Sequence, residues 1–336
     1  MTVEQITAEH YRAQQTLARH TVNQAQDLWA RVQPGQVLDS WLAQLAEMLR
    51  ALVLGQTAAA AMAQPYADAL AEEQGIPLAA AVVAPAAFAG LAADGRALTG
   101  LLMQPALRTM GLLVRGADDE TALLAGLESL TRIVDTEVSD ASRAADQVGM
   151  VANRRWVTYV RHVSLPACGR CIILAGRTYS WSTGFLRHPR CDCTMVPHRE
   201  GDTPPPSPED LFARMPEPDQ QKAFTVGGAE AIKLGADMGQ VLNARRGMQT
   251  AGGRLITTEG TTVRGLAGKK LGNVKKVRGE RYRRSQTVRP MPEQLLADAG
   301  DDRDEAIRLL EQFGYLDKGS TGRRQRAAAR AAASLS

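Results

Sequence analysis

All four cysteines of this 336-residue chain lie in one short central segment, together with a histidine at metal-ligand spacing. Cys168 and Cys171 form a CxxC pair, and His188 and Cys191 form an HxxC pair. Zinc takes about four thiolate or imidazole ligands in a tetrahedron, and tight turns supply such ligands in pairs. We therefore predict one Zn²⁺ ion held by these four side chains, with Cys193 as the alternative to Cys191.

The predicted zinc is structural, because four protein ligands leave no coordination position for a reacting water. Such an ion contributes on the order of 10 kcal/mol to the folding of a segment that lacks a core of its own. Two other interpretations stay open for the same residues. The thiols can be reduced core residues or can form a disulfide. Alternatively, Cys168, Cys191 or Cys193 is a nucleophile that His188 activates, as in cysteine proteases, although the sequence identifies no Asn or Asp partner.

A second group of residues, close to the C-terminus, is strongly basic and nearly free of aromatic side chains. Its members are Lys269, Lys270, Lys275, Lys276, Arg278, Arg281, Arg283 and Arg284. Such a segment neutralises phosphates without reading sequence, and its binding weakens as salt rises. Because it lacks stacking platforms, we predict DNA binding through the backbone. The alternative is a solvated surface or a contact with acidic protein surfaces.

The elements that position these residues are predicted to be mainly α-helical, since alanine is abundant and aromatic residues make up only 4% of the chain. We expect a helical N-terminal domain over residues 1–148 and a small, irregular α+β Cys/His module, zinc-knuckle-like, over residues 149–200. A Pro-rich linker followed by helices occupies residues 201–250. A helical and basic C-terminal region with a tail occupies residues 251–336.

Local signals place several helix ends. Thr2 ahead of Gln5 predicts a capping box, and the apolar pattern that begins at Asp39 predicts a helix that stops at Gly55. Ser207 before a proline predicts the start of a short helix, and residues 302–313 predict a helix near the end of the chain.

Neither a targeting signal nor a membrane span is expected. The N-terminus lacks a basic region followed by an apolar stretch and a cleavage site, so we expect no export by that route. Residues 76–93 carry no charge, but they are dominated by alanine and interrupted by Pro77 and Pro85. We therefore predict a loop and helix ends there, and no membrane partner.

The central segment resembles the head-morphogenesis domain of the Mu F-like minor head proteins of tailed phages. That family combines a CxxCxxLxGxxY segment with a later HPxCxCxxxP segment, and the chain carries both, from Cys168 to Tyr179 and from His188 to Pro197. Asp192 departs from the basic residue that members often carry between the last two cysteines. IKLGADMGQVLNARRGM, TTEGTTVRGLAG and DRDEAIRLLEQFGYL are similar to C-terminal segments of such proteins in phages of actinobacteria.

The resemblance implies a minor capsid protein, present in few copies near the portal, that acts in head assembly, DNA packaging or DNA delivery. It implies portal, capsid and scaffold proteins and phage genomic DNA as partners, with assembly in the host cytoplasm and a final place in the virion. It brings no catalytic residues. Two alternatives remain: a capsid maturation protease that cleaves scaffold or capsid protein, and a zinc-dependent nucleic-acid-binding protein with sequence preference.

Overall fold

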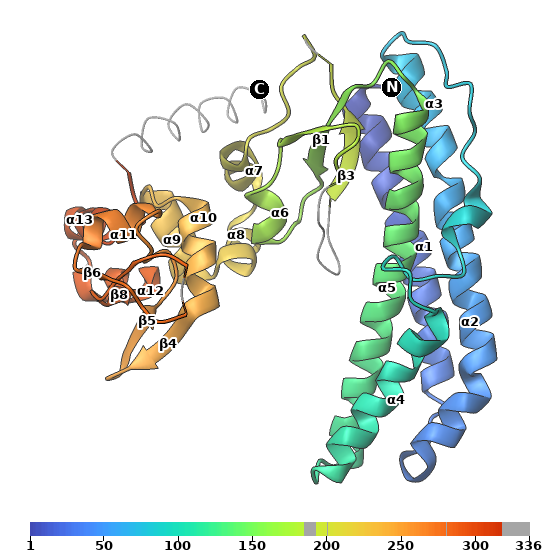
Figure 1. Ribbon diagram of the computed structural model, residues 1–336, viewed down its shortest axis with the longest axis horizontal. Coiled ribbons are helices and arrows are strands. Elements are labelled where there is room, and N and C mark those ends of the chain that lie inside the picture. Colours follow the sequence, from blue (N-terminus) through green and yellow to red (C-terminus); the bar gives the residue numbers. More distant parts are fainter. Residues whose placement is uncertain (185–192, 200, 280, 318–336) are drawn as a thin grey trace. The chain divides into compact units, whose positions relative to one another are not determined.

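The computed structural model describes residues 1–184, 193–199, 201–279 and 281–317, and it confirms a mainly α-helical protein (Figure 1). By its internal contacts the chain divides into two compact units. The helical unit comprises residues 1–164 and 177–203, and the C-terminal unit comprises residues 165–176 and 204–336. Residues 149–200 of the expected Cys/His module therefore contribute to both units. The passage at Thr203–Pro204 falls inside the expected Pro-rich linker.

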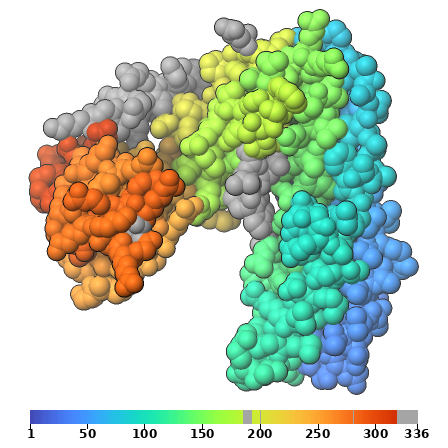
Figure 2. All heavy atoms as spheres, viewed as in Figure 1, coloured from blue at the N-terminus to red at the C-terminus, as the bar shows by residue number. Residues whose placement is uncertain are grey.

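Five α-helices build most of the helical unit, whose surface is elongated (Figures 1 and 2). They are α1 (Val3–Trp29), α2 (Val37–Ala61), α3 (Ala63–Glu73), α4 (Leu98–Val114) and α5 (Asp119–Ala152), with 3₁₀ turns η1 (Pro34–Gln36) and η2 (Pro85–Phe88) between them. The Thr2–Gln5 capping box starts α1 as predicted. Of the described residues, none lies in a helix that is both long and apolar enough to cross a membrane.

The expected end of α2 at Gly55 is wrong, because the helix continues to Ala61. Gly55 lies where α2 approaches its neighbours most closely. A Cβ atom there would come within 2.7 Å of Thr21 Oγ1 and 3.1 Å of Val138 Cγ2. The glycine thus permits close packing of α1, α2 and α5 at this point, and the loss of helix propensity, about 1 kcal/mol relative to alanine, is offset by that packing.

Two tryptophans anchor the core of the helical unit. Trp41 is fully buried and donates its indole N–H to the carbonyl oxygen of Leu102 over 2.7 Å. Trp29 meets Trp41 edge to face, with ring centroids 5.1 Å apart, and donates to the carbonyl oxygen of Leu123. Both rings therefore satisfy their polar atom while they bury a large apolar area, which ties α1 and α2 to α4 and α5.

A three-stranded antiparallel sheet completes the helical unit. Its strands are β1 (Thr158–Val163), β2 (Thr178–Ser180) and β3 (Cys193–Pro197), and β1 lies in the centre. All of β3 is buried. Tyr66 of α3 donates its hydroxyl to the carbonyl oxygen of Met195 over 2.8 Å, which fixes the sheet to the helices. β1 contains Thr158, Tyr159, Val160 and Val163, which are residue types that favour strands.

The C-terminal unit combines short helices with small sheets. Its helices are α6 (Gly169–Ile172), α7 (Pro208–Arg214), α8 (Glu217–Phe224), α9 (Val226–Leu234), α10 (Met238–Ala244), η3 (Arg245–Gly247), α11 (Leu266–Leu271), α12 (Pro292–Ala299) and α13 (Arg303–Gln312). Its strands are β4 (Met248–Ala251), β5 (Arg254–Thr257), β6 (Val274–Lys275), β7 (Arg284–Ser285) and β8 (Arg289–Pro290). Ser207 caps α7 as predicted, and α13 lies within the helix predicted over residues 302–313.

A buried arginine organises the core of the C-terminal unit. Arg289 is only 1% exposed, and its guanidinium lies 3.8 Å from the centre of the Tyr315 ring. It donates to the backbone carbonyls of Glu259, Phe313 and Gly314 and to the side chain of Gln240. Burial lowers the pKa of Arg289 below its ordinary value. These acceptors and the aromatic ring take the place of water around the charge.

Candidate functional site

The CxxC pair lies at the start of α6, in the C-terminal unit. Cys168 is the N-cap residue, and its sulfur accepts a hydrogen bond from the backbone N–H of Cys171 over 3.5 Å. Cys171 is fully buried, whereas Cys168 is partly exposed. Gly169 between them packs so closely on the backbone of Ala223 that a Cβ would come within 2.7 Å of its carbonyl oxygen. The pair therefore lies on a tight turn, and the sulfur of Cys168 already accepts a backbone hydrogen bond there.

The remaining predicted zinc ligands are placed differently. Cys193 begins β3 in the helical unit, where it is 1% exposed and pairs in register with Val163. His188 and Cys191 lie outside the described residues. Within the described ranges, no group of three or more His, Cys, Asp or Glu side chains gathers at metal-binding distances. The zinc site accordingly stays a prediction.

The basic residues predicted to bind DNA lie on α11 and around β6 and β7. Lys269, Lys275, Arg278 and others are exposed, but some of the eight also serve the fold. Lys270 Nζ donates to the carbonyl oxygens of Glu311 and Leu316 over 2.9 and 3.0 Å, and thereby caps the end of α13. Arg283 and Arg284 donate to the backbone carbonyls of Val274 and Thr258.

Two residues near these cations were missed by the sequence analysis. Arg264 donates to the hydroxyl of Tyr282 over 2.8 Å, and its guanidinium carbon lies 4.5 Å from the centre of that ring. Arg281 approaches the same ring to 5.5 Å. Arg264 lies before α11, apart from the Lys/Arg run, so its separation in sequence hid it. Tyr282 is the only aromatic residue between Phe224 and Phe313, which is the signal that could have identified it.

A buried polar seam between α1 and α5 was also missed. His10 Nε2 lies 3.0 Å from Asp146 Oδ1, Gln14 Nε2 donates to Asp146 Oδ2 over 3.0 Å, and Gln14 also reaches Ser142. The Tyr66 ring stacks on His10 at 3.9 Å, and burial holds the pKa of Tyr66 far above its usual range. The spacing His10–Gln14 and Ser142–Asp146 is four residues, which is the signal that places each pair on one helix face.

This seam contains a serine, a histidine and an aspartate, but it is not arranged as a hydrolytic triad. His10 faces Asp146 through Nε2, and Gln14 separates it from Ser142. His10, Ser142 and Asp146 are 8%, 0% and 1% exposed, so a peptide substrate has no access to them. A nucleophilic serine needs direct contact with its base and an open approach. The seam therefore supports packing specificity rather than proteolysis.

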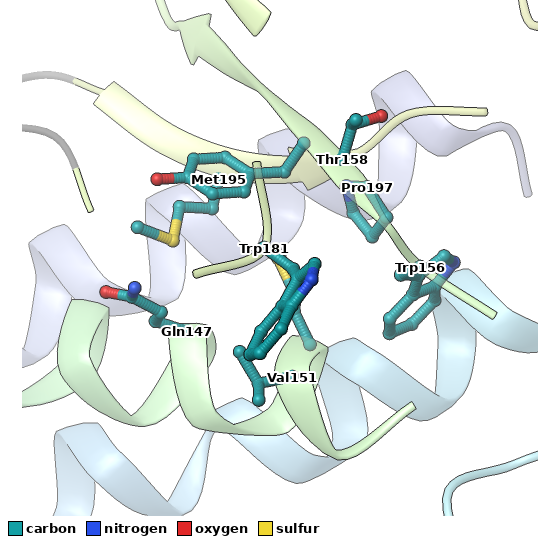
Figure 3. A pocket seen from close by; sticks show the side chains of 9 residues that line it. Gln147, Val151, Trp156, Thr158, Trp181, Met195 and Pro197 are labelled. Carbon is teal, nitrogen blue, oxygen red and sulfur yellow. The ribbon is translucent and has the colours of Figure 1, made fainter. Parts of the chain in front are cut away.

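A shallow pocket opens to solvent beside the three-stranded sheet (Figure 3). Trp181, which is 51% exposed, lies over it toward Val151 of α5, while Met195 of β3 and Trp156 contribute further apolar surface. Among the described residues that line it, none is acidic, basic or a cysteine. The pocket therefore offers mainly apolar contact, and its polar side chains are those of Gln147, Thr158 and Tyr159.

One known protein family matches this chain over more than half of its length. The sequence profile of the VG15 protein family matches residues 1–217. The chain belongs to the VG15 family. This is a viral protein family, and it accounts for the whole helical unit and for α6 and α7 of the C-terminal unit. No curated protein and no solved structure matches the chain.

Of the two candidate regions of this VG15 family member, one lies inside the matched residues and the other lies outside them. The CxxC pair and Cys193 fall inside the matched residues, as does the polar seam between α1 and α5. Arg264, Tyr282 and the basic residues around β6 and β7 fall outside them. Properties shared across the family are thus to be sought in residues 1–217.

Proposed function

We propose that this viral protein is a minor head protein of a tailed phage, a structural component of the virion that acts near the portal in head assembly, DNA packaging or DNA delivery. The observation that carries the proposal is the VG15 family match over residues 1–217. The Mu F-like sequence pattern from Cys168 to Tyr179 and from His188 to Pro197 supports it, because both segments of that pattern occur in order. Portal, capsid and scaffold proteins are the proposed protein partners.

Quantitative mass spectrometry of purified virions tests this proposal. The protein is expected in virions at a fixed, low ratio to the major capsid protein, and it should persist after nuclease treatment and density-gradient purification. A knockout phage complemented in trans should yield intact heads only when the protein is supplied. Absence from purified virions, together with normal heads in the knockout, would contradict the structural role.

The alternative enzyme class makes a different prediction that the same system can check. A capsid maturation protease, when co-expressed with capsid and scaffold proteins, generates new protein termini. We expect none, because the Ser142, His10 and Asp146 grouping is buried and wrongly connected for catalysis. New termini that disappear in a Cys168→Ser or Cys193→Ser variant would instead favour a cysteine protease.

We also propose Zn²⁺ as a structural cofactor, with Cys168, Cys171, His188 and Cys191 as ligands and Cys193 as the alternative to Cys191. The support is the ligand spacing and the turn at α6, where an N–H already faces the Cys168 sulfur. Purified protein should contain about one zinc per chain by elemental analysis. Cys168→Ser should release the metal and lower the melting temperature, whereas Ser164→Ala, a nearby change outside the ligand set, should do neither.

A further inference from the structure

The described residues of the C-terminal unit concentrate positive charge on one small substructure. We call residues 274–279 and 281–285 the basic hairpin: β6 and β7 pair antiparallel, Val274 with Ser285 and Lys275 with Arg284. Residues 261–264 lie along the other side of β7, where the backbone N–H of Val263 donates to the carbonyl oxygen of Arg283 and that of Ser285 donates to the carbonyl oxygen of Thr261. From 261 to 285 the sequence holds nine lysines and arginines and one acidic residue, Glu280.

One aromatic ring gathers two of these arginines. The guanidinium of Arg264 contacts both the hydroxyl and the face of Tyr282, and the guanidinium of Arg281 also lies over that ring at 5.5 Å. Attraction between a guanidinium and the ring face holds a cation that would otherwise move freely in water. The ring therefore keeps two positive charges close together at an exposed position, and the positive potential that results attracts anions.

Neither arginine is neutralised by the part of the chain that the structure describes, where neither Arg264 nor Arg281 forms an ion pair with a carboxylate. Two other exposed arginines of the unit are placed differently. Arg254 pairs with Asp298, and Arg308 pairs with Glu305. These two arginines thus have acidic partners, whereas Arg264 and Arg281 share an aromatic ring.

We propose that Arg264 and Arg281, held by Tyr282 on the basic hairpin, form a clamp for the phosphate backbone of double-stranded DNA. The clamp deepens the proposed function, on which it rests for the identity of its partner, the packaged genome. Guanidinium groups bind phosphate oxygens in a planar, bidentate geometry that lysine cannot provide. Arg264 and Tyr282 thereby join the basic residues as members of one surface.

Duplex DNA fits this surface better than a single strand does. Proteins that bind single strands stack successive bases on aromatic side chains. Here the only aromatic ring from Thr225 to Gln312 is Tyr282, which two arginines already contact. With no free ring to stack bases, the surface can recognise only the charge and spacing of phosphates.

The test uses the full-length protein and fluorescence anisotropy with a labelled 30-base-pair duplex of mixed sequence, measured over a series of salt concentrations. Arg264→Ala and Arg281→Ala should each weaken binding several-fold and reduce the slope of log K against log salt by about 0.9, one phosphate contact apiece. Arg308→Ala is the matched control. It removes the same charge from an exposed arginine of the same unit, and it should change neither quantity.

Tyr282 distinguishes a positioned clamp from a diffuse charge effect. Tyr282→Leu leaves the net charge unchanged, yet it should weaken duplex binding as much as either arginine variant does. Tyr282→Phe keeps the ring and loses only the hydroxyl that Arg264 contacts. Its affinity for the duplex should therefore lie between those of Tyr282→Leu and the parent protein. Circular dichroism melting of each variant checks that the unit stays folded. Undiminished binding by folded Tyr282→Leu would overturn the clamp.

Three further results would overturn the proposal. They are tighter binding of a 30-nucleotide single strand than of the duplex, a preference among duplexes of different sequence, and equal effects of Arg264→Ala and Arg308→Ala. Sequence preference would favour the zinc-dependent nucleic-acid-binding alternative. Failure here is distinguishable from failure of the virion assignment, because mass spectrometry of virions does not depend on DNA binding.

Discussion

At individual positions of the helices, the distance to the neighbouring side chains decides whether a larger residue fits. Gly126 of α5 faces Trp29 and Thr109, and a Cβ atom built on it would overlap with both side chains. Gly111 of α4 has only the mobile end of Arg115 near that position, at 3.6 Å. Both glycines lie inside continuous helices, yet only the first is required by its neighbours.

This contrast makes a prediction for two otherwise identical substitutions. Gly126→Ala should destabilise the protein by about 1–3 kcal/mol, because Trp29 and Thr109 must move to admit the methyl group. Gly111→Ala should stabilise it by about 0.5–1 kcal/mol through helix propensity. Urea denaturation followed by circular dichroism measures both. Equal stabilities of the two variants would show that α5 does not approach Trp29 as closely as described.

At the scale of elements, the buried polar seam specifies how α1 and α5 face each other. Apolar packing fixes the arrangement of two long helices only in part, because the hydrophobic effect is non-directional. His10 and Gln14 on α1 match Ser142 and Asp146 on α5, so a shifted register would leave these groups buried without partners. The seam therefore selects one arrangement of the helices.

Removing the central acceptor of this seam should be costly. Asp146→Ala leaves His10 and Gln14 buried without their acceptor, and we expect a loss of about 3 kcal/mol in the free energy of unfolding. Glu128→Ala is the control on the same helix, since Glu128 is exposed and reaches Arg108 only at 3.7 Å. That variant should stay within about 0.5 kcal/mol of the parent protein. A comparable loss in both variants would contradict the special role of the seam.

At the scale of the whole molecule, the C-terminal unit is discontinuous in sequence. Residues 165–176 leave the helical unit after β1 and supply α6, which packs through Gly169 on Ala223, Phe224 and Leu242. A fragment that begins at Pro204 would expose the surface that α6 covers. A Cβ atom on Gly176 would lie 3.1 Å from the carbonyl oxygen of Pro206. The segment therefore ends beside the point where the unit resumes in the sequence.

Two fragments test this discontinuity. Residues 165–176, joined by a short Gly-Ser linker to residues 204–317, should melt cooperatively. Residues 204–317 alone should melt at a lower temperature, by about 4–8 °C for each kcal/mol that the contacts of α6 contribute. Identical melting curves for the two fragments would mean that α6 is dispensable for the unit.

Several features of this protein followed from local sequence, because their causes are local. The capping box at Thr2, the cap at Ser207, the helix within residues 302–313 and the mainly helical content depend on residues within one or two turns of each other. Strand formation after Asn153 likewise reflects β-branched and aromatic residues within a short stretch.

Tertiary structure alone decided the rest, because it depends on residues far apart in the chain. Gly55 predicts a helix end by its own propensity, but packing against Thr21 and Val138 carries the helix past it. Lys270 belongs to a basic run in the sequence, yet it caps α13 some forty residues later. Arg264 meets Tyr282 only when residues 261–264 lie along β7. Spacing along the chain reports neighbours within a helix or strand, whereas contacts between elements depend on the folded backbone.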